Sequence, residues 1–188
     1  MDDHTPEAPS SGALVLTAWV FYLLMTLVGL GLMLVQDLPF EGAILGDGAN
    51  VGFDALLGAG CGIAVVGLTW LFRDLGPVRE LNQELRALLG QPSSLAIAGL
   101  AVSSAIGEEI FFRGALQPLL GFWITAALFG LLHGGTSRRF RVWTIFAVAA
   151  GLLLGWLATY TENLLAPILC HMTINYFNLH LVVGTESS

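Results

Sequence analysis

The sequence predicts an all-α fold: a polytopic transmembrane helical bundle of about six spans, with one short amphipathic helix lying at the membrane interface. Three observations support this. Hydrophobic residues make up 55 % of the 188 positions and charged residues only 11 %, and the mean hydropathy of +0.77 is far above that of soluble domains. Apolar runs near the ~20 residues that cross a bilayer recur along the chain. The alternating pattern of membrane strands is missing, so closed helices are expected.

The apolar runs define the elements in order. Residues 1–12 are acidic and lack the basic region of a cleaved signal, so we expect a disordered tail followed by a retained helix. A second short tail is expected at 184–188. The six expected spans are 14–35, 51–72, 94–116, 120–136, 142–160 and 164–183. Small residues four apart, as at Gly58 and Gly62, are expected to let neighbouring helices approach closely.

The segment GPVRELNQELRALLGQP, residues 76–92, separates the second and third spans. It opens with Gly-Pro and closes with Gly, which are typical start and stop signals of a helix. Its apolar residues fall on one helical stripe. We interpret it as a connecting helix on the cytoplasmic interface; docking of a substrate is the alternative.

Arginines supply all the positive charge and predict the orientation. Arg73, Arg79 and Arg86 follow the second span, and Arg138, Arg139 and Arg141 follow the fourth. By the positive-inside rule both loops are cytoplasmic, and both termini are then cytoplasmic in a multi-pass protein of the plasma or inner membrane. The acidic loop between the first two spans contains no base, which fits the outer face.

Composition also excludes several classes of function. The net charge of −7 comes with no cluster of cations large enough for a nucleic-acid surface, so no nucleic-acid partner is expected. Cys61 and Cys170 lack CxxC spacing and are interpreted as small buried hydrophobes. No GxSxG motif supports a serine nucleophile, and Ser103, Ser104, Thr125 and Thr173 are expected to bond their own backbone. The oligomeric state has no sequence signature.

Three polar clusters interrupt the spans and are the candidate site. A charged side chain at the centre of a membrane helix costs about 2.5–3.5 kcal/mol on insertion scales, so such residues are functional candidates that face the bundle interior. The clusters are Glu108, Glu109 and Arg113 in EEIFFR, His133 in FGLLH, and His171 with Asn175 in HMTIN.

The spacing within each cluster predicts local geometry. Glu109 and Arg113 are four residues apart and can form an ion pair, which leaves Glu108 without a local partner. His171 and Asn175 share one helix face. The third and fourth spans run in opposite directions, so His133 reaches the depth of Glu108 only if the helices tilt or the fourth one is short.

These residue types can perform hydrolysis inside a dry cavity. A glutamate shielded from water can act as a general base. Histidines can hold zinc, and both histidines and asparagine can stabilise an oxyanion. Structural interpretations stand beside this one. Both glutamates can belong to a structural ion pair with Arg113, His133 can be interfacial, and His171 and Asn175 can link helices by hydrogen bonds.

The three motifs resemble those of the CPBP family of intramembrane proteases (CAAX protease and bacteriocin-processing, or Abi, family), which includes the type II prenyl protein proteases. EEIFFR matches EExxxR, FGLLH matches FxxxH and HMTIN matches HxxxN, in that order, over residues 94–180. The resemblance implies that Glu108 activates the attacking water beside Glu109, that Arg113 is structural, and that His133, His171 and Asn175 place the water, stabilise the oxyanion or bind a metal. Zinc and a metal-free glutamate mechanism both remain open.

The resemblance divides the chain and defines the expected function. Residues 13–92 are expected to hold two N-terminal spans and the cytoplasmic amphipathic helix, and residues 93–183 a CPBP-like catalytic core. We expect a bacterial intramembrane endopeptidase acting, within the lipid bilayer, on a membrane peptide or protein that is lipidated in some relatives. The alternatives are a non-catalytic scaffold or bacteriocin-immunity factor of the same family, and a proton or cation transporter.

Overall fold

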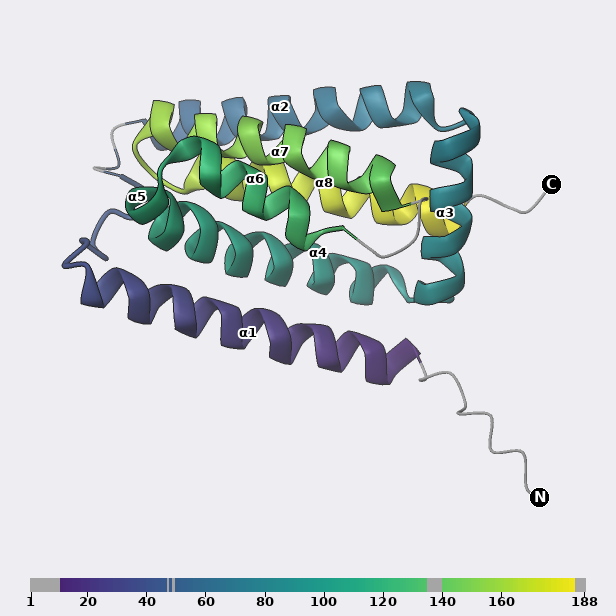
Figure 1. Ribbon diagram of the computed structural model, residues 1–188, viewed down its shortest axis with the longest axis horizontal. Coiled ribbons are helices and arrows are strands. Elements are labelled where there is room, and N and C mark those ends of the chain that lie inside the picture. The colour runs from purple at the N-terminus through teal and green to yellow at the C-terminus, as the bar shows by residue number, and fades with distance from the viewer. Residues whose placement is uncertain (1–10, 47, 49, 135–139, 185–188) are drawn as a thin grey trace, which may run out of the picture.

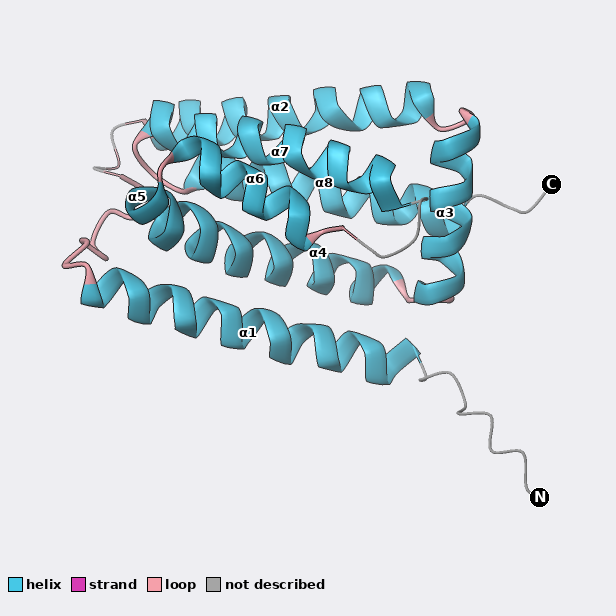
Figure 2. Cartoon of the chain, viewed as in Figure 1, coloured by secondary structure: helices cyan, strands magenta, loops and turns pink. Residues whose placement is uncertain are grey.

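The computed structural model describes residues 11–46, 48, 50–134 and 140–184, and within these ranges every regular element is a helix (Figure 2). The prediction of an all-helical fold is confirmed. The predicted tails at 1–12 and 184–188 lie mostly outside the described residues, but helix α1 already begins at Ser11 and helix α8 ends at Gly184. The helices, in chain order, are α1 (Ser11–Val35), α2 (Val51–Phe72), α3 (Gly76–Leu89), α4 (Ser94–Glu109), η1 (Ile110–Leu116), α5 (Gln117–Leu120), α6 (Phe122–Leu132), α7 (Phe140–Thr161) and α8 (Leu165–Gly184).

Four helical segments of the described chain are long and apolar enough to cross a membrane: Gly12–Val35, Val51–Phe72, Ser94–Leu120 and Phe140–Thr161. The other two predicted spans differ from these. The span expected at 120–136 is the shorter helix α6, with 11 residues. The span expected at 164–183 is α8, whose 20 residues suffice in length but include several polar side chains. The chain is therefore a multi-pass membrane protein.

The long helices lie roughly alongside one another, and α8 occupies the middle of the bundle (Figure 1). Helix α8 packs against α2 and α4, α1 lies on the far side of α4, and α6 packs against α7. Apolar side chains on the outer faces of α1 and α2, such as Leu23 and Leu56, are more than half exposed. Such faces require lipid to cover them, because a soluble protein rarely leaves so much contiguous apolar surface open.

Helix α3 crosses the ends of the other helices, at the end of the bundle where α1 begins and α8 ends (Figure 1). Leu81 is its buried residue and packs toward the bundle. The helix begins with Pro77 in its first turn and stops at Gly90, whose φ of 67° suits glycine. The predicted connecting helix is confirmed.

Glycines allow the closest helix contacts, as the small-residue pairs predict. A Cβ at Gly62 of α2 would lie 2.7 Å from the Thr173 Cβ and 2.8 Å from the Cys170 carbonyl oxygen of α8. Gly130 of α6 meets Val148 of α7 in the same way. Both cysteines are free, and Cys170 is fully buried, as expected of a small core residue.

Candidate active site

Glu108 and Glu109 are the last two residues of α4, at the point where the backbone widens into the π-helix η1. The helix begins cleanly at Ser93, whose side chain accepts a hydrogen bond from the Ala96 amide. Glu108 is only 5 % exposed and Glu109 is fully buried. π-Helical turns inside α-helices often mark functional sites, because the extra residue per turn re-aims the side chains.

The predicted ion pair between Glu109 and Arg113 is present and fully buried. Nη1 of Arg113 donates to Oε1 of Glu109 at 2.9 Å, and Nη2 donates to the Gly151 carbonyl of α7 at 3.1 Å. The guanidinium also lies 4.4 Å from the centre of the Phe129 ring of α6, a favourable cation–π distance. Arg113 therefore ties η1 to both α6 and α7.

The carboxylate of Glu109 also reaches α8. Its Oε1 lies 2.7 Å from Nδ1 of His171, which donates to it. One carboxylate oxygen thus accepts from both the guanidinium and the imidazole. The charge from Arg113 offsets that of Glu109, so Glu109 serves as an orienting group for His171 as well as an ion-pair partner.

His133 lies directly after α6 and forms its C-cap. Its Nδ1 is 2.7 Å from the Phe129 carbonyl oxygen, one turn earlier, and the Phe129 and His133 rings lie 4.4 Å apart. Because α6 has only 11 residues, it brings His133 to the level of Glu108. A short fourth helix is thus the feature that brings His133 to the membrane depth of Glu108; the sequence left open whether tilt or shortening would do so.

The two histidines face Glu108 through the same atom. Since each Nδ1 donates a hydrogen bond, each neutral ring carries its lone pair on Nε2. Oε2 of Glu108 lies 3.4 Å from Nε2 of His133 and 4.0 Å from Nε2 of His171. This oxygen is buried and has no hydrogen-bond partner among the described residues. With both rings neutral, three acceptor atoms converge, and a proton donor such as a water molecule would satisfy two of them at a time.

Asn175 lies one turn beyond His171, on the same face of α8. Its Nδ2 donates to Oγ of Ser104 at 2.9 Å, and Ser104 donates in turn to the Ala101 carbonyl. The serine proton is committed to the backbone, so Ser104 accepts from the amide and fixes which end of the Asn175 side chain faces α4. The second Nδ2 hydrogen is free for another acceptor.

Metal binding by His133 and His171 stays a prediction. In the described ranges, no group of three or more His, Cys, Asp or Glu side chains has an arrangement suited to hold a metal ion. The residues therefore do not fit a zinc centre of the usual three-ligand kind.

The structure brings together every predicted site residue, although they come from three helices and one cap. Ser104 bonds its own backbone as predicted, like Ser103 and Thr173. Its second role, as the acceptor for Asn175, was missed. The prediction of a backbone bond was wrong for Thr125, whose buried hydroxyl has no hydrogen-bond partner among the described residues.

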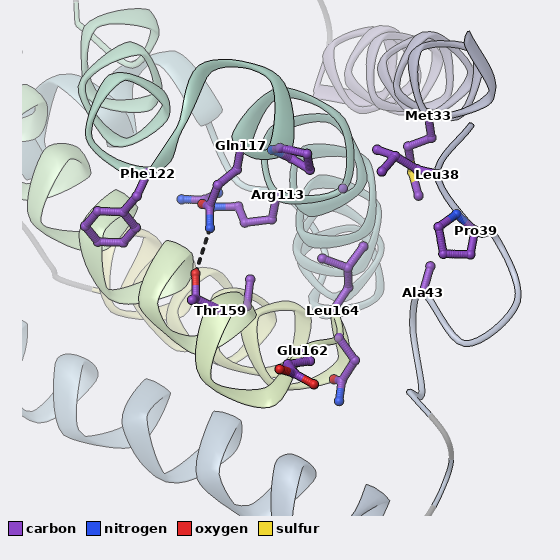
Figure 3. A pocket seen from close by; sticks show the side chains of 14 residues that line it. Met33, Leu38, Pro39, Ala43, Arg113, Gln117, Phe122, Thr159, Glu162 and Leu164 are labelled. Atoms are coloured by element: carbon purple, nitrogen blue, oxygen red, sulfur yellow. Dashed lines mark hydrogen bonds between the residues drawn. The ribbon is translucent and has the colours of Figure 1, made fainter. Parts of the chain in front are cut away.

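Arg113 also lines a cavity of about 480 Å³ between α5 and the end of α7 (Figure 3). Apolar residues such as Met33 and Phe122 line it, and Gln117 donates to the Thr159 hydroxyl across one wall at 3.1 Å. Its lining includes neither His133 nor His171. Arg113 both lines this cavity and pairs with Glu109.

Fold and site together define a multi-pass helical membrane protein with glutamate, histidine and asparagine side chains gathered inside its bundle. Residues 90–177 match the family described as type II CAAX prenyl endopeptidase Rce1-like. The resemblance predicted from the three motifs is confirmed for this segment, which contains every motif residue.

One curated protein is similar to part of the chain. Over 78 residues the chain is 35 % identical to the uncharacterized protein YpbD of Bacillus subtilis (strain 168), a stretch that is 40 % of this chain and 40 % of the relative. The chain thus matches well under half of that relative's length. No solved structure matches the chain.

Proposed function

We propose that the chain is an intramembrane endopeptidase that hydrolyses a peptide bond of a membrane-associated peptide or protein, with Glu108 as the base that activates water. A lipidated peptide is one candidate substrate. The Rce1-like match supports the reaction class. The single observation that carries the proposal is the unpartnered Oε2 of Glu108, facing Nε2 of both His133 and His171.

The chemistry follows from that arrangement. A water molecule between the three acceptors donates one proton to Glu108 while its oxygen attacks the scissile carbonyl carbon. The C–N bond of the tetrahedral intermediate then breaks, and Glu108 passes the proton to the leaving amine. The products are a carboxylic acid and an amine, so no other reactant is needed.

The remaining residues hold the water and stabilise developing charge. Since one water proton goes to Glu108, one O–H remains, and it is accepted by Nε2 of either His133 or His171, because both Nδ1 atoms are already committed. Asn175 has an Nδ2 hydrogen beyond the one that Ser104 accepts, and this hydrogen is suited to an oxyanion. Preorganised donors of this kind are worth about 10²–10³ in rate.

We place the predicted cytoplasmic face at the end of the bundle that carries α3. Helix α3 contains Arg79 and Arg86, and the adjoining helix ends carry Arg73 and Arg141. The first residues of α1 and the last of α8 lie at the same end (Figure 1). Arg138 and Arg139 lie outside the described residues. Cysteine-accessibility labelling in sealed vesicles measures this orientation.

The experiment is cleavage of a quenched membrane-peptide library in liposomes by the wild type and Glu108→Gln, each with and without a zinc chelator. We expect cleavage by the wild type and its loss in Glu108→Gln, which keeps the shape of the side chain and removes the base. Chelator sensitivity would assign zinc to the site. If the wild type cuts no peptide and Glu108→Gln keeps the wild-type cellular phenotype, the result favours a scaffold. Ion flux in liposomes without peptide would favour a transporter.

A further inference from the structure

The end of α1 contacts the π-helix η1 from outside the segment that matches the protease family. That match covers residues 90–177, and α1 lies far upstream of it. The helix stops in a Schellman motif, in which Asp37 adopts a φ of 54° and the amide of Leu38 donates to the Met33 carbonyl at 3.0 Å. This motif fixes the backbone at Gln36, the residue directly before Asp37.

Gln36 joins α1 to η1 through its side-chain amide. Its Nε2 donates to the Leu32 carbonyl of its own helix at 3.0 Å and to the Ala115 carbonyl of η1 at 3.2 Å. An amide nitrogen carries two hydrogens, so each bond uses one of them. Ala115 is fully buried and lies 79 positions further along the chain. The half-buried Gln36 therefore ties the end of α1 to the buried backbone of η1.

Close packing supports this bond. A Cβ at Gly29 of α1 would lie only 3.0 Å from the Cα of Phe111 in η1. Toward α7, the side chains of Arg113 and Gln117 each donate to a backbone carbonyl of that helix, both at 3.1 Å. The π-helix is therefore held by α1 as well as by α7.

The hydrogen-bond register of η1 determines which way its neighbours face. Its amides reach back five residues, and the Gln117 amide still donates to the Phe112 carbonyl. One extra residue in a turn rotates the rest of the helix by about 100° relative to a continuous α-helix. Glu109 before the turn bonds His171 of α8, while Gln117 after it bonds α7. Both contacts form together only in the π register.

We propose that Gln36 is a positioning residue of the candidate active site. Its bond to Ala115 holds the end of η1 in the π register, and this register sets how Arg113 meets Glu109. Glu109 in turn orients His171, which presents Nε2 to the catalytic glutamate. The proposal rests on the proposed function, and it gives α1, which lies outside the family match, a part in the site.

The kinetic test compares Gln36→Met with the wild type on one cleaved peptide. Methionine keeps the length of the side chain and removes both donors. We expect kcat to fall about 3- to 10-fold, the range for one neutral hydrogen bond, with KM within about twofold and the unfolding temperature within about 4 °C of the wild type. Gln83→Met, at an exposed position of α3, is the matched control and should keep wild-type kcat. Gln36→Lys retains a donor of similar reach and should recover at least about half of the wild-type kcat.

Three kinetic results would overturn the proposal. The first is a Gln36→Met enzyme with wild-type kcat. The second is a Gln36→Lys enzyme as slow as Gln36→Met, because the donor would then not matter. The third is a loss of kcat matched by a rise in KM and a large fall in unfolding temperature, which would make Gln36 a packing residue. In each case cleavage by the wild type leaves the proposed function intact.

A spectroscopic test needs no activity. Nitrogen NMR of protein carrying isotope-labelled histidine reports the Nδ1 atom of His171, whose signal is assigned with the variant His171→Gln. We expect this signal to shift in Gln36→Met, because its 2.7 Å bond to Glu109 changes, and to stay constant in Gln83→Met. If the wild type cuts no peptide, the proposed function fails, and the NMR result alone decides the positioning role: an unchanged His171 signal overturns it.

Discussion

Replacing Arg113 by alanine tests the predicted structural ion pair. Both side chains of the pair are fully buried, and the guanidinium makes bonds of 2.9 Å to Glu109 and 3.1 Å to the Gly151 carbonyl. Removing one partner of a buried pair leaves an uncompensated charge and costs about 3–5 kcal/mol. At about 2–4 °C per kcal/mol for a chain of this size, the unfolding temperature should fall by about 6–20 °C. His171 still donates to Glu109, so the lower half of that range is expected.

The assay is thermal unfolding in detergent, followed with a thiol-reactive dye. Cys170 is fully buried and reacts only when the bundle opens. Arg79→Ala, on the exposed face of α3, is the matched control and should unfold near the wild-type temperature. Pairing Arg113→Met with Glu109→Gln removes both charges and should recover much of the loss. An Arg113→Ala protein that unfolds at the wild-type temperature would refute the reasoning.

Two further predictions use neighbouring residues as their controls. Gly62→Ala should destabilise the protein by about 1–3 kcal/mol, because its new Cβ collides with α8. The control Gly60→Ala, whose Cβ meets nothing within 4 Å, should be neutral or stabilising by up to about 1 kcal/mol. Equal unfolding temperatures for the two variants would contradict the close packing of α2 on α8. Ser104→Ala should lower kcat about 3- to 10-fold at constant stability, because Asn175 loses the acceptor that orients it. The control Ser103→Ala should keep the wild-type kcat. A lower kcat for Ser103→Ala than for Ser104→Ala would reject the orienting role of Ser104.

Helix positions could be predicted from the sequence because the bilayer imposes a length and an apolar composition on each span. The predicted span 51–72 coincides with α2, and the connecting helix predicted in the segment 76–92 is α3, Gly76–Leu89. The prediction was least accurate at 120–136, where α6 ends at Leu132. Hydropathy falls directly beyond that residue, where the sequence reads HGGT at 133–136, so the predicted end lies four residues too late. His133 caps the helix by folding its ring back onto the Phe129 carbonyl.

Site residues could be predicted where the partners share a helix. The pairing of Glu109 with Arg113 follows from their spacing alone. The bond from His171 to Glu109 joins residues 62 positions apart, so it depends on how α8 packs against α4 and leaves no periodic signal.

The most direct test of the central claim is the ratio of cleavage rates between wild type and Glu108→Gln on one peptide in liposomes, with Glu80→Gln as the control. We predict at least about a 100-fold loss of kcat for Glu108→Gln, as expected for removal of a general base. The unfolding temperature should not change, and Glu80→Gln should keep the wild-type rate. Equal rates for the wild type and Glu108→Gln would mean that another group activates the water, and Glu108 would then not be the base.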